Sequence, residues 1–194
     1  LKKNCIEGYI IPKNDEFFSE YDQNNRLKNI SNFTGERHSL TSLRGERGLL
    51  ICFICNHCPY VKAIITRLVA DAKTLRQEGI NSVAIMSNDY QNVAADSPEQ
   101  MQLFAEKHSF DFPYLVDEGQ AVARAYGAVC TPDFFGLNAE LSLHYRGRLD
   151  DLKMGVSGER NAELLEAMRQ IAKTGAGPAE QTPSIGCSIK WRAQ

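Results

Sequence analysis

The sequence has no long hydrophobic run. Its longest uninterrupted apolar stretch, from Gly48 to Ile54, is much too short to cross a bilayer. No charged-then-apolar secretion signal opens the chain. We therefore expect no membrane partner and a cytoplasmic protein. The sequence begins at Leu1 rather than Met, so we expect a periplasmic location instead if an N-terminal leader has been removed.

A charge imbalance and a regular cysteine framework are also missing. The formal net charge is -2 and there is no basic stripe, so the sequence gives no electrostatic basis for a nucleic-acid partner. Six cysteines lie unevenly in a chain of 194 residues, unlike the pattern of a small disulfide scaffold. In a reducing compartment, such a count indicates redox or metal chemistry at one cluster.

Short apolar runs alternate with segments of helical period. The expected strands and helices are a buried strand at Gly48–Ile54, a helix from Cys58 to Gly79, a strand at Ser82–Met86, a helix starting at Ser97, a strand at Phe112–Val116, a helix at Glu118–Tyr126, strands on both sides of Asn138–Glu140, and a helix ending near Gly175. Two short strands around a turn are also expected between Leu27 and Leu43. This order predicts an α/β layered sandwich.

We expect one compact domain with additions at both ends. Residues 1–26 read as an N-terminal arm, residues 27–175 as the domain, and residues 176–194 as a tail that docks on the domain. The tail is rich in Pro, Gly and polar residues until Ile185, and it carries the only tryptophan.

The stretch that carries chemistry is Cys55-Asn56-His57-Cys58, which follows a strand and opens a helix. A helix N-terminus stabilises a thiolate, because its unpaired N–H groups and dipole favour negative charge. We predict that Cys55 is the exposed nucleophile and Cys58 the more buried resolving thiol. Two roles are open to His57: stabilising the Cys55 thiolate, or serving as a solvated turn residue. The stretch therefore predicts a thiol-disulfide oxidoreductase.

The chain resembles the thioredoxin superfamily at two separated motifs. The second is Tyr126-Gly127-Ala-Val-Cys-Thr-Pro132, which is similar to the thioredoxin segment that faces the dithiol with a cis-proline. Within that superfamily the chain is most similar to the redoxin branch, the alkyl hydroperoxide reductase and thiol-specific antioxidant family. The motifs that carry this resemblance are Cys-Asn-His-Cys-Pro-Tyr-Val, Asn-Asp at 88, Phe-Pro-Tyr-Leu at 112, Cys-Thr-Pro-Asp-Phe-Phe at 130, Tyr-Arg-Gly at 145 and Gly-Cys-Ser-Ile-Lys-Trp at 186.

The resemblance implies a thioredoxin-like three-layer α/β/α sandwich with a mixed central sheet and an N-terminal β-hairpin extension. It implies a cis Thr131–Pro132 bond, a Thr131 backbone free to pair with an extended segment of the substrate, and substrate contacts at Thr131, Pro132 and Asn56. No cofactor and no metal are expected. The expected partner is a redox protein or a small thiol, and the chain is expected to be a monomer or weak homodimer.

The chain also departs from thioredoxin. Ile54 replaces the tryptophan before the first cysteine, and Leu49 stands where thioredoxin has a buried aspartate that takes the proton of the resolving thiol. Asp89 and Asp133 are the candidates for a replacement acceptor, although each also fits a turn or surface acid.

The other thiols have open roles. Cys130 and Cys187 are candidates for additional redox thiols, with simple burial as the alternative for each. Cys52 lies three positions before Cys55, so alternation along a strand predicts that the two point to opposite faces.

Three alternative functions remain. A peroxiredoxin-like thiol peroxidase would use Cys58 as the peroxidatic cysteine and Cys55 as the resolving one, because Cys58-Pro59 resembles the peroxiredoxin Cys-Pro. A metal-binding module would gather thiolates and an imidazole for zinc or copper(I), from Cys55, His57, Cys58, Cys130 and Cys187. The third alternative is a binding module of thioredoxin-like fold without redox activity.

Overall fold

The computed structural model describes residues 30–32 and 35–193. Its elements are, in order, β1 (Ile30–Asn32), β2 (Arg37–His38), α2 (Leu40–Leu43), β3 (Gly48–Phe53), α3 (Pro59–Gln77), β4 (Ile80–Met86), the 3-10 helix η1 (Ala94–Asp96), α4 (Pro98–Lys107), β5 (Tyr114–Val116), α5 (Ala121–Tyr126), β6 (Cys130–Thr131), β7 (Asp133–Leu137), β8 (Leu143–Gly147), α6 (Glu163–Thr174) and β9 (Cys187–Ser188). The predicted arm at residues 1–26 lies outside the described residues, and the division into arm, domain and tail stays a prediction.

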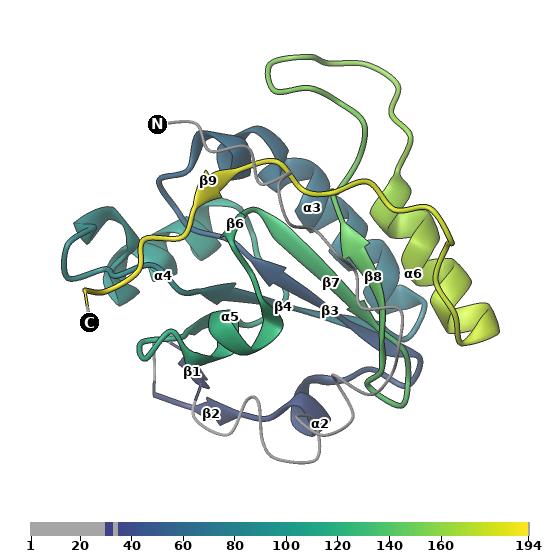
Figure 1. Cartoon of the computed structure of the whole chain (residues 1–194), viewed down its shortest axis with the longest axis horizontal. Helices are drawn as coiled ribbons and strands as arrows, with labels where there is room; N and C mark the ends of the chain where they lie inside the picture. Colours follow the sequence, from purple (N-terminus) through teal and green to yellow (C-terminus); the bar gives the residue numbers. More distant parts are fainter. Residues whose placement is uncertain (1–29, 33–34, 194) are drawn as a thin grey trace.

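Seven strands form one mixed sheet in the order β2-β1-β5-β4-β3-β7-β8 (Figure 1). The three inner strands β3, β4 and β5 are parallel to one another. β7 is antiparallel to β3, and β8 is antiparallel to β7. β1 and β2 pair antiparallel and form the expected N-terminal hairpin. A separate two-stranded ladder joins β6 to β9 near the C-terminus.

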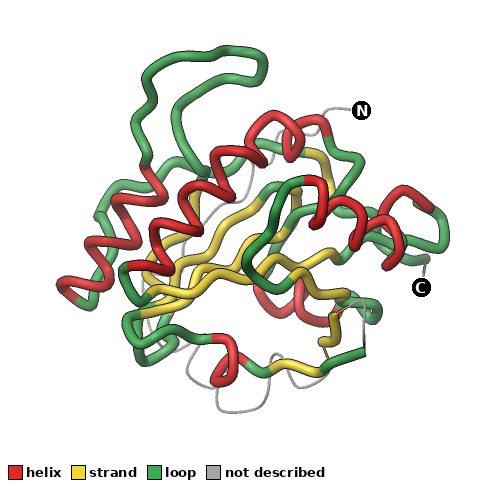
Figure 2. Tube along the Cα trace, turned by 180° about the vertical axis from the view of Figure 1, so that it is seen from behind, coloured by secondary structure: helices red, strands yellow, loops and turns green. Residues whose placement is uncertain are grey.

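Helices cover both faces of the sheet. Along β3 the buried side chains alternate: Leu50 and Cys52 belong to one core cluster, and Leu49, Ile51 and Phe53 to the other. The helices α3 and α6 lie side by side across the first face, as Figure 2 shows from behind, and α2 and α5 contribute to the second core. The predicted three-layer α/β/α sandwich with a thioredoxin-like arrangement is therefore confirmed.

The helix α3 is the element that positions the cysteine pair. Its N-cap is Cys58 and its first residue is Pro59, whose missing N–H is not needed in the first turn. A buried stripe at three- and four-residue spacing, which includes Val61, Ile65 and Leu68, packs it against the sheet. The chain therefore passes directly from the C-terminal end of the central strand, through Cys55 to Cys58, into this helix.

One predicted helix starts later than the sequence pattern indicates. The helix α5 begins at Ala121 rather than Glu118, because Gln120 adopts a left-handed conformation with φ 57°. The Asp117 carboxylate accepts hydrogen bonds from the backbone N–H groups of Val122 and Ala123, which satisfies the first turn of the helix. The local cap by Asp117 therefore sets the start of this helix.

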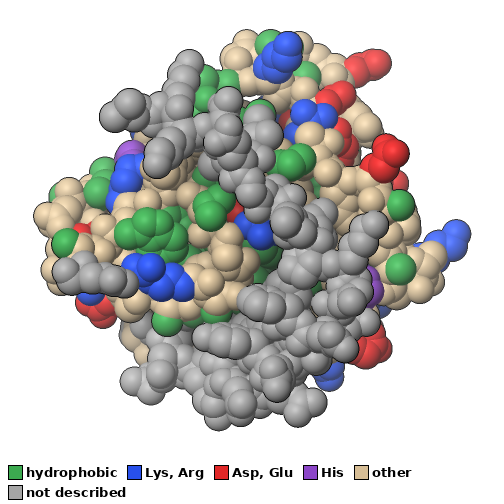
Figure 3. Space-filling model, in the orientation of Figure 1, with side chains coloured by type: hydrophobic (Ala, Val, Ile, Leu, Met, Phe, Trp, Pro, Cys, Tyr) green, Lys and Arg blue, Asp and Glu red, His purple; other side chains and the backbone are tan. Residues whose placement is uncertain are grey.

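In the described part of the chain, no helix is long and apolar enough to cross a membrane. Acidic and basic side chains both appear on the coloured surface in Figure 3, spread over several elements.

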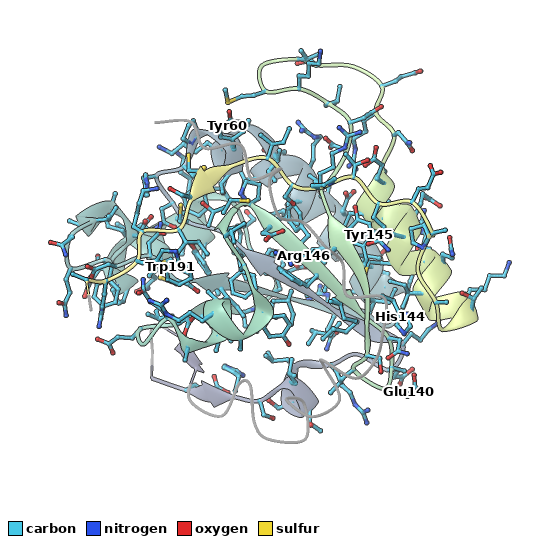
Figure 4. All side chains as sticks on the ribbon, in the orientation of Figure 1. Tyr60, Glu140, His144, Tyr145, Arg146 and Trp191 are labelled. Atoms are coloured by element: carbon cyan, nitrogen blue, oxygen red, sulfur yellow. The ribbon has the colours of Figure 1, made fainter. Side chains whose placement is uncertain are left out.

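Arg146, labelled in Figure 4, extends over the ring of Phe135 at 4.8 Å from its centroid and donates to the Gly127 carbonyl. The contact ties β8 to the loop that leads into β6.

Candidate active site

Cys55 and Cys58 lie together at the end of β3 and the start of α3, and both side chains are fully buried. They converge on one residue of the facing loop. The Cys55 Sγ lies 3.2 Å from Thr131 Oγ1, and the Cys58 thiol donates to the Thr131 carbonyl at 3.1 Å. The Thr131–Pro132 peptide bond is cis, as the resemblance implies. The two sequence motifs are thus opposite walls of one site.

The electrostatics of the pair reverse the expected order. A hydrogen bond from the Cys55 thiol lowers the pKa of Cys58, and the Val61 backbone N–H and Cys187 lower it further against the effect of burial. The pKa of Cys55 is raised by that shared hydrogen bond, by burial and by the charge of Asp96. In its thiol form Cys58 donates to the Thr131 carbonyl. The prediction that Cys55 is exposed and Cys58 more buried is wrong, because neither side chain has exposed surface, and the assignment of nucleophile and resolving thiol stays a prediction.

Asp96 is the residue that sequence reasoning missed. It is fully buried at the end of η1, and its carboxylate holds the loop between the cysteines. Its Oδ1 accepts from the backbone N–H groups of Asn56 at 2.8 Å and His57 at 3.3 Å. Its Oδ2 accepts from the side chain of Asn88 at 2.8 Å and lies 2.7 Å from His57 Nδ1. The local sequence around Asp96 contains no signal for this role.

His57 and Asn56 both face inward. The alternative interpretation of His57 as a solvated turn residue is therefore wrong. The His57 ring points to Asp96 and is about a quarter exposed, with 29% of its side chain accessible. Asn56 is buried, donates to the Ala95 carbonyl and accepts from the Tyr114 hydroxyl. The predicted contact of Asn56 with a substrate would require these bonds to break, and the substrate-binding roles stay predictions.

The Thr131 backbone is not free, contrary to the expectation from the resemblance. β6 pairs antiparallel with β9, and Thr131 is the register partner of Cys187. Gly186 makes this approach feasible, because a Cβ at that position would overlap the Thr131 carbonyl. The tail of this chain thus occupies the edge where a substrate segment was expected.

The remaining described cysteines fall into different environments. Cys130 is fully buried, and its thiol lies 3.6 Å from the Pro132 carbonyl. Cys187 is half-buried and packs against the core cluster that contains Cys55 and Cys58. Cys52 belongs to that same cluster, so the predicted opposite orientation of Cys52 and Cys55 is wrong. The reason is that β3 ends at Phe53, before the alternation reaches Cys55.

Neither candidate proton acceptor is the acid that influences the pair. Asp89 pairs with Arg192 and accepts from Asn92, and its pKa is lowered by these donors. Asp133 lies beside Arg146. Asp96 is the carboxylate whose charge reaches Cys55.

Comparison with models of protein families identifies the family of this chain. The model of the AhpC/TSA family matches residues 23–149, which is more than half of the chain. The chain belongs to the AhpC/TSA family. Membership in this redoxin family supports a redox function for the chain. The comparison with curated proteins found no match.

Several solved structures are similar to this chain. An uncharacterized conserved protein from Geobacillus kaustophilus is 39% identical, with a TM-score of 0.77 and coverage of 88% of this chain and 87% of that one. A hypothetical protein from Sinorhizobium meliloti 1021 is 35% identical, with a TM-score of 0.82 and coverage of 88% and 94%. A thioredoxin-like protein from Aeropyrum pernix is 14% identical, covers 82% of this chain and 96% of its own, and has a TM-score of 0.56, which shows the fold.

The ligand set offered to a metal differs from the one expected. Cys55, His57 and Asp96 have side-chain ligand atoms all within 4.8 Å of one another, and Cys130 is not in the group. Sulfur, nitrogen and oxygen ligands of this kind suit zinc. Both Asp96 oxygens already accept hydrogen bonds, one from the Asn56 N–H in the loop Cys55–Cys58, here called the redox loop, and one from the Asn88 side chain. An ion would have to displace one of these donors. This geometry favours a positioning role for Asp96 over a metal site.

An apolar pocket adjoins the site on the side of α3. It has a volume of about 450 Å³, and its lining includes Tyr60, Pro132, Phe134 and Ile185. Tyr60, labelled in Figure 4, lies near the start of α3, two residues after Cys58. The pocket therefore lies next to both the loop that contains Thr131 and Pro132, here called the proline loop, and the tail.

Proposed function

We propose that the chain is a thiol-disulfide oxidoreductase that makes and breaks one disulfide between Cys55 and Cys58 in exchange with a protein partner. The observation that carries this proposal is that both sulfurs, at the N-terminus of α3, contact the same residue, Thr131, which precedes the cis-proline. Disulfide exchange needs one thiolate and one nearby thiol that can displace it. The pair supplies both, with Cys58 as the thiolate.

His57 and Asp96 fit the proton transfer that exchange requires. Cys55 must lose its proton before it can attack a sulfur bonded to Cys58. The His57 ring lies within 4.8 Å of the Cys55 sulfur, and Asp96 orients the ring through Nδ1. A base held by a third group in this way can accept a thiol proton. We assign that role to His57, with Asp96 as its positioning residue.

The proposed partner is a redox protein or a small thiol, and the proposed form is a cytoplasmic monomer or weak homodimer. Its test is equilibration in dithiothreitol buffers followed by peptide mapping. We expect one reversible disulfide, joining Cys55 to Cys58, and its loss in both Cys55→Ser and Cys58→Ser. An oxidised protein in which these two cysteines never pair would refute the proposal.

A second candidate is a thiol peroxidase, which one observation favours. Cys58 is the N-cap of α3, and its lowered pKa makes it the nucleophile, as a peroxidatic cysteine must be. Cys55 would then resolve the sulfenic acid that peroxide forms on Cys58. Stopped-flow measurement of peroxide consumption separates the two: a rate constant no higher than that of free cysteine excludes the peroxidase.

A further inference from the structure

Access to the pair is limited in the described structure. Cys55 and Cys58 have no exposed surface, although exchange requires a partner sulfur to approach in line with the attacking sulfur. Cys187 is different, because it is half-buried on β9 and presents part of its surface to solvent. An incoming disulfide therefore meets Cys187 before it meets the pair.

Cys187 is also in contact with the pair. It packs against the core cluster that contains both thiols, and its register partner Thr131 contacts both of them. The partly exposed Cys187 thus lies on the same loop contact as the two fully buried thiols.

The tail is held in this position from both sides. Before Cys187, Gly186 allows close contact with the proline loop, and Ser184 donates to the Gly147 carbonyl at 2.6 Å. After it, the Lys190 backbone donates to Asn88 Oδ1 and accepts from the Asp89 N–H, each at 2.8 Å. Asn88 also donates to Asp96, so one residue connects the tail to the redox loop. The placement of Cys187 is therefore a built feature of the fold.

We propose that Cys187 is a relay thiol, which exchanges with the partner disulfide at the surface and passes it to the Cys55/Cys58 pair. This proposal rests on the proposed function and adds the route by which a large partner reaches a buried dithiol. The expected partner is a protein with an accessible disulfide or dithiol.

The relay balances in three exchanges. The Cys187 thiolate attacks the partner disulfide, forms a mixed disulfide and releases the first partner thiolate. The Cys58 thiolate then attacks the Cys187 sulfur, forms a Cys58–Cys187 disulfide and releases the second. Cys55, after giving its proton to His57, attacks Cys58, forms the Cys55–Cys58 disulfide and restores the Cys187 thiolate. The partner gains two electrons from the pair, and its two released thiolates take up one proton from His57 and one from solvent. The reverse sequence oxidises a partner dithiol.

The first test traps the intermediate. In a Cys5→Ser background, Cys55→Ser removes the last exchange, so oxidation with diamide is expected to give a Cys58–Cys187 disulfide on peptide mapping. The same oxidation of protein with Cys55 present is expected to give Cys55–Cys58. A Cys55→Ser protein in which Cys58 stays reduced, or pairs with Cys130, would overturn the relay.

The second test compares substrates of different size. With insulin as the protein disulfide and dithiothreitol as the reductant, Cys187→Ser is expected to lower the catalysed rate about tenfold or more, since the accessible attacking thiol is lost. Cys187→Ala should behave alike, and Ser188→Ala, an exposed neighbour, should keep the full rate. Formation of Cys55–Cys58 by oxidised dithiothreitol at equilibrium should persist in Cys187→Ser.

These outcomes separate the two levels of inference. A full insulin rate in both Cys187 variants would refute the relay and leave the dithiol in place. Failure of Cys55–Cys58 to form with small reagents in the unsubstituted chain would refute the proposed function itself.

Discussion

Replacing Asp96 by Asn tests the clamp that holds the redox loop. The substitution keeps the shape of a fully buried side chain but exchanges one acceptor oxygen for an NH₂ group. If the amide oxygen keeps the two backbone donors at Oδ1, the NH₂ group faces His57 Nδ1 and the Asn88 amide. Rotating Asn88 cannot relieve the conflict without cost, because its own oxygen accepts from the Lys190 N–H of the tail.

The magnitude follows from the bonds that change. A hydrogen bond to a charged group contributes about 1.5–3 kcal/mol, and a buried donor left unpaired costs a comparable amount. The His57 ring can relieve one contact by presenting an unprotonated nitrogen, which leaves the Asn88 contact. We therefore expect Asp96→Asn to lower the free energy of unfolding by about 2–4 kcal/mol. Asp96→Ala, which also leaves the Asn56 N–H unpaired, should cost more.

Two measurements check this expectation on reduced protein. Urea denaturation gives the free energy of unfolding, with the exposed Glu159→Gln as a control expected to fall within about 0.5 kcal/mol of the unsubstituted chain. Titration of thiolate absorbance gives the second readout. Loss of the Asp96 charge should lower the pKa of Cys55, because that charge raises it. A stability loss below about 0.5 kcal/mol, or a higher Cys55 pKa, would refute the clamp.

Four further predictions concern the thiols, the tail and the core. Cys55→Ala should raise the pKa of Cys58 whereas Cys55→Ser should retain its low value, as measured by thiolate absorbance, because only serine keeps the hydrogen-bond donor. Because the pKa of Cys58 is lowered in the folded state, its ionisation stabilises the fold fully above the ordinary thiol pKa of 9.0, and this contribution is lost as the pH falls through the lowered pKa. The free energy of unfolding of the unsubstituted chain should therefore exceed that of Cys58→Ser by less at acid pH. A difference that grew toward acid pH would contradict this. Gly186→Ala should displace the tail and change the fluorescence of Trp191, the only tryptophan, and an unchanged spectrum would refute the close approach. Leu50→Ala, in the fully buried central strand, should cost about 2–5 kcal/mol in thermal or urea unfolding, and a loss under about 1 kcal/mol would be inconsistent with its burial.

Local patterns in the sequence account for most of the fold. The apolar run of β3, the three- and four-residue spacing in α3 and the glycine after α6 each act within one element, so the sequence alone predicts them. The cysteine pair and the proline loop were also predictable, because both are short motifs whose context is a strand followed by a helix or a turn.

The parts that escaped prediction depend on contacts between distant segments. Asp96 is about forty residues from the cysteines, and only the folding of η1 against the redox loop brings its carboxylate to their backbone. The acidity order of the two thiols depends on which N–H groups reach each sulfur, which spacing does not encode. The Gly-Cys pattern of the tail indicates docking, but not that Cys187 becomes the register partner of Thr131.

The tail combines features that the sequence shows separately. Trp191, labelled in Figure 4, lies under the guanidinium of Arg124, with 4.5 Å between the guanidinium carbon and the ring centroid. Arg124 belongs to α5, the helix that precedes the proline loop. The tail thus bridges α5 and the redox loop, which is why its loss should be felt at the cysteine pair.

The reduction potential of the Cys55/Cys58 pair is the most direct test of the dithiol. Equilibration in glutathione or dithiothreitol buffers, with the disulfide located by peptide mapping, measures it. We expect a single two-electron couple between these two cysteines. Its reduction potential should be less negative than that of thioredoxin, which is about -270 mV, because a stabilised Cys58 thiolate favours the reduced form. If no buffer produces a Cys55–Cys58 disulfide, the pair is not a redox dithiol.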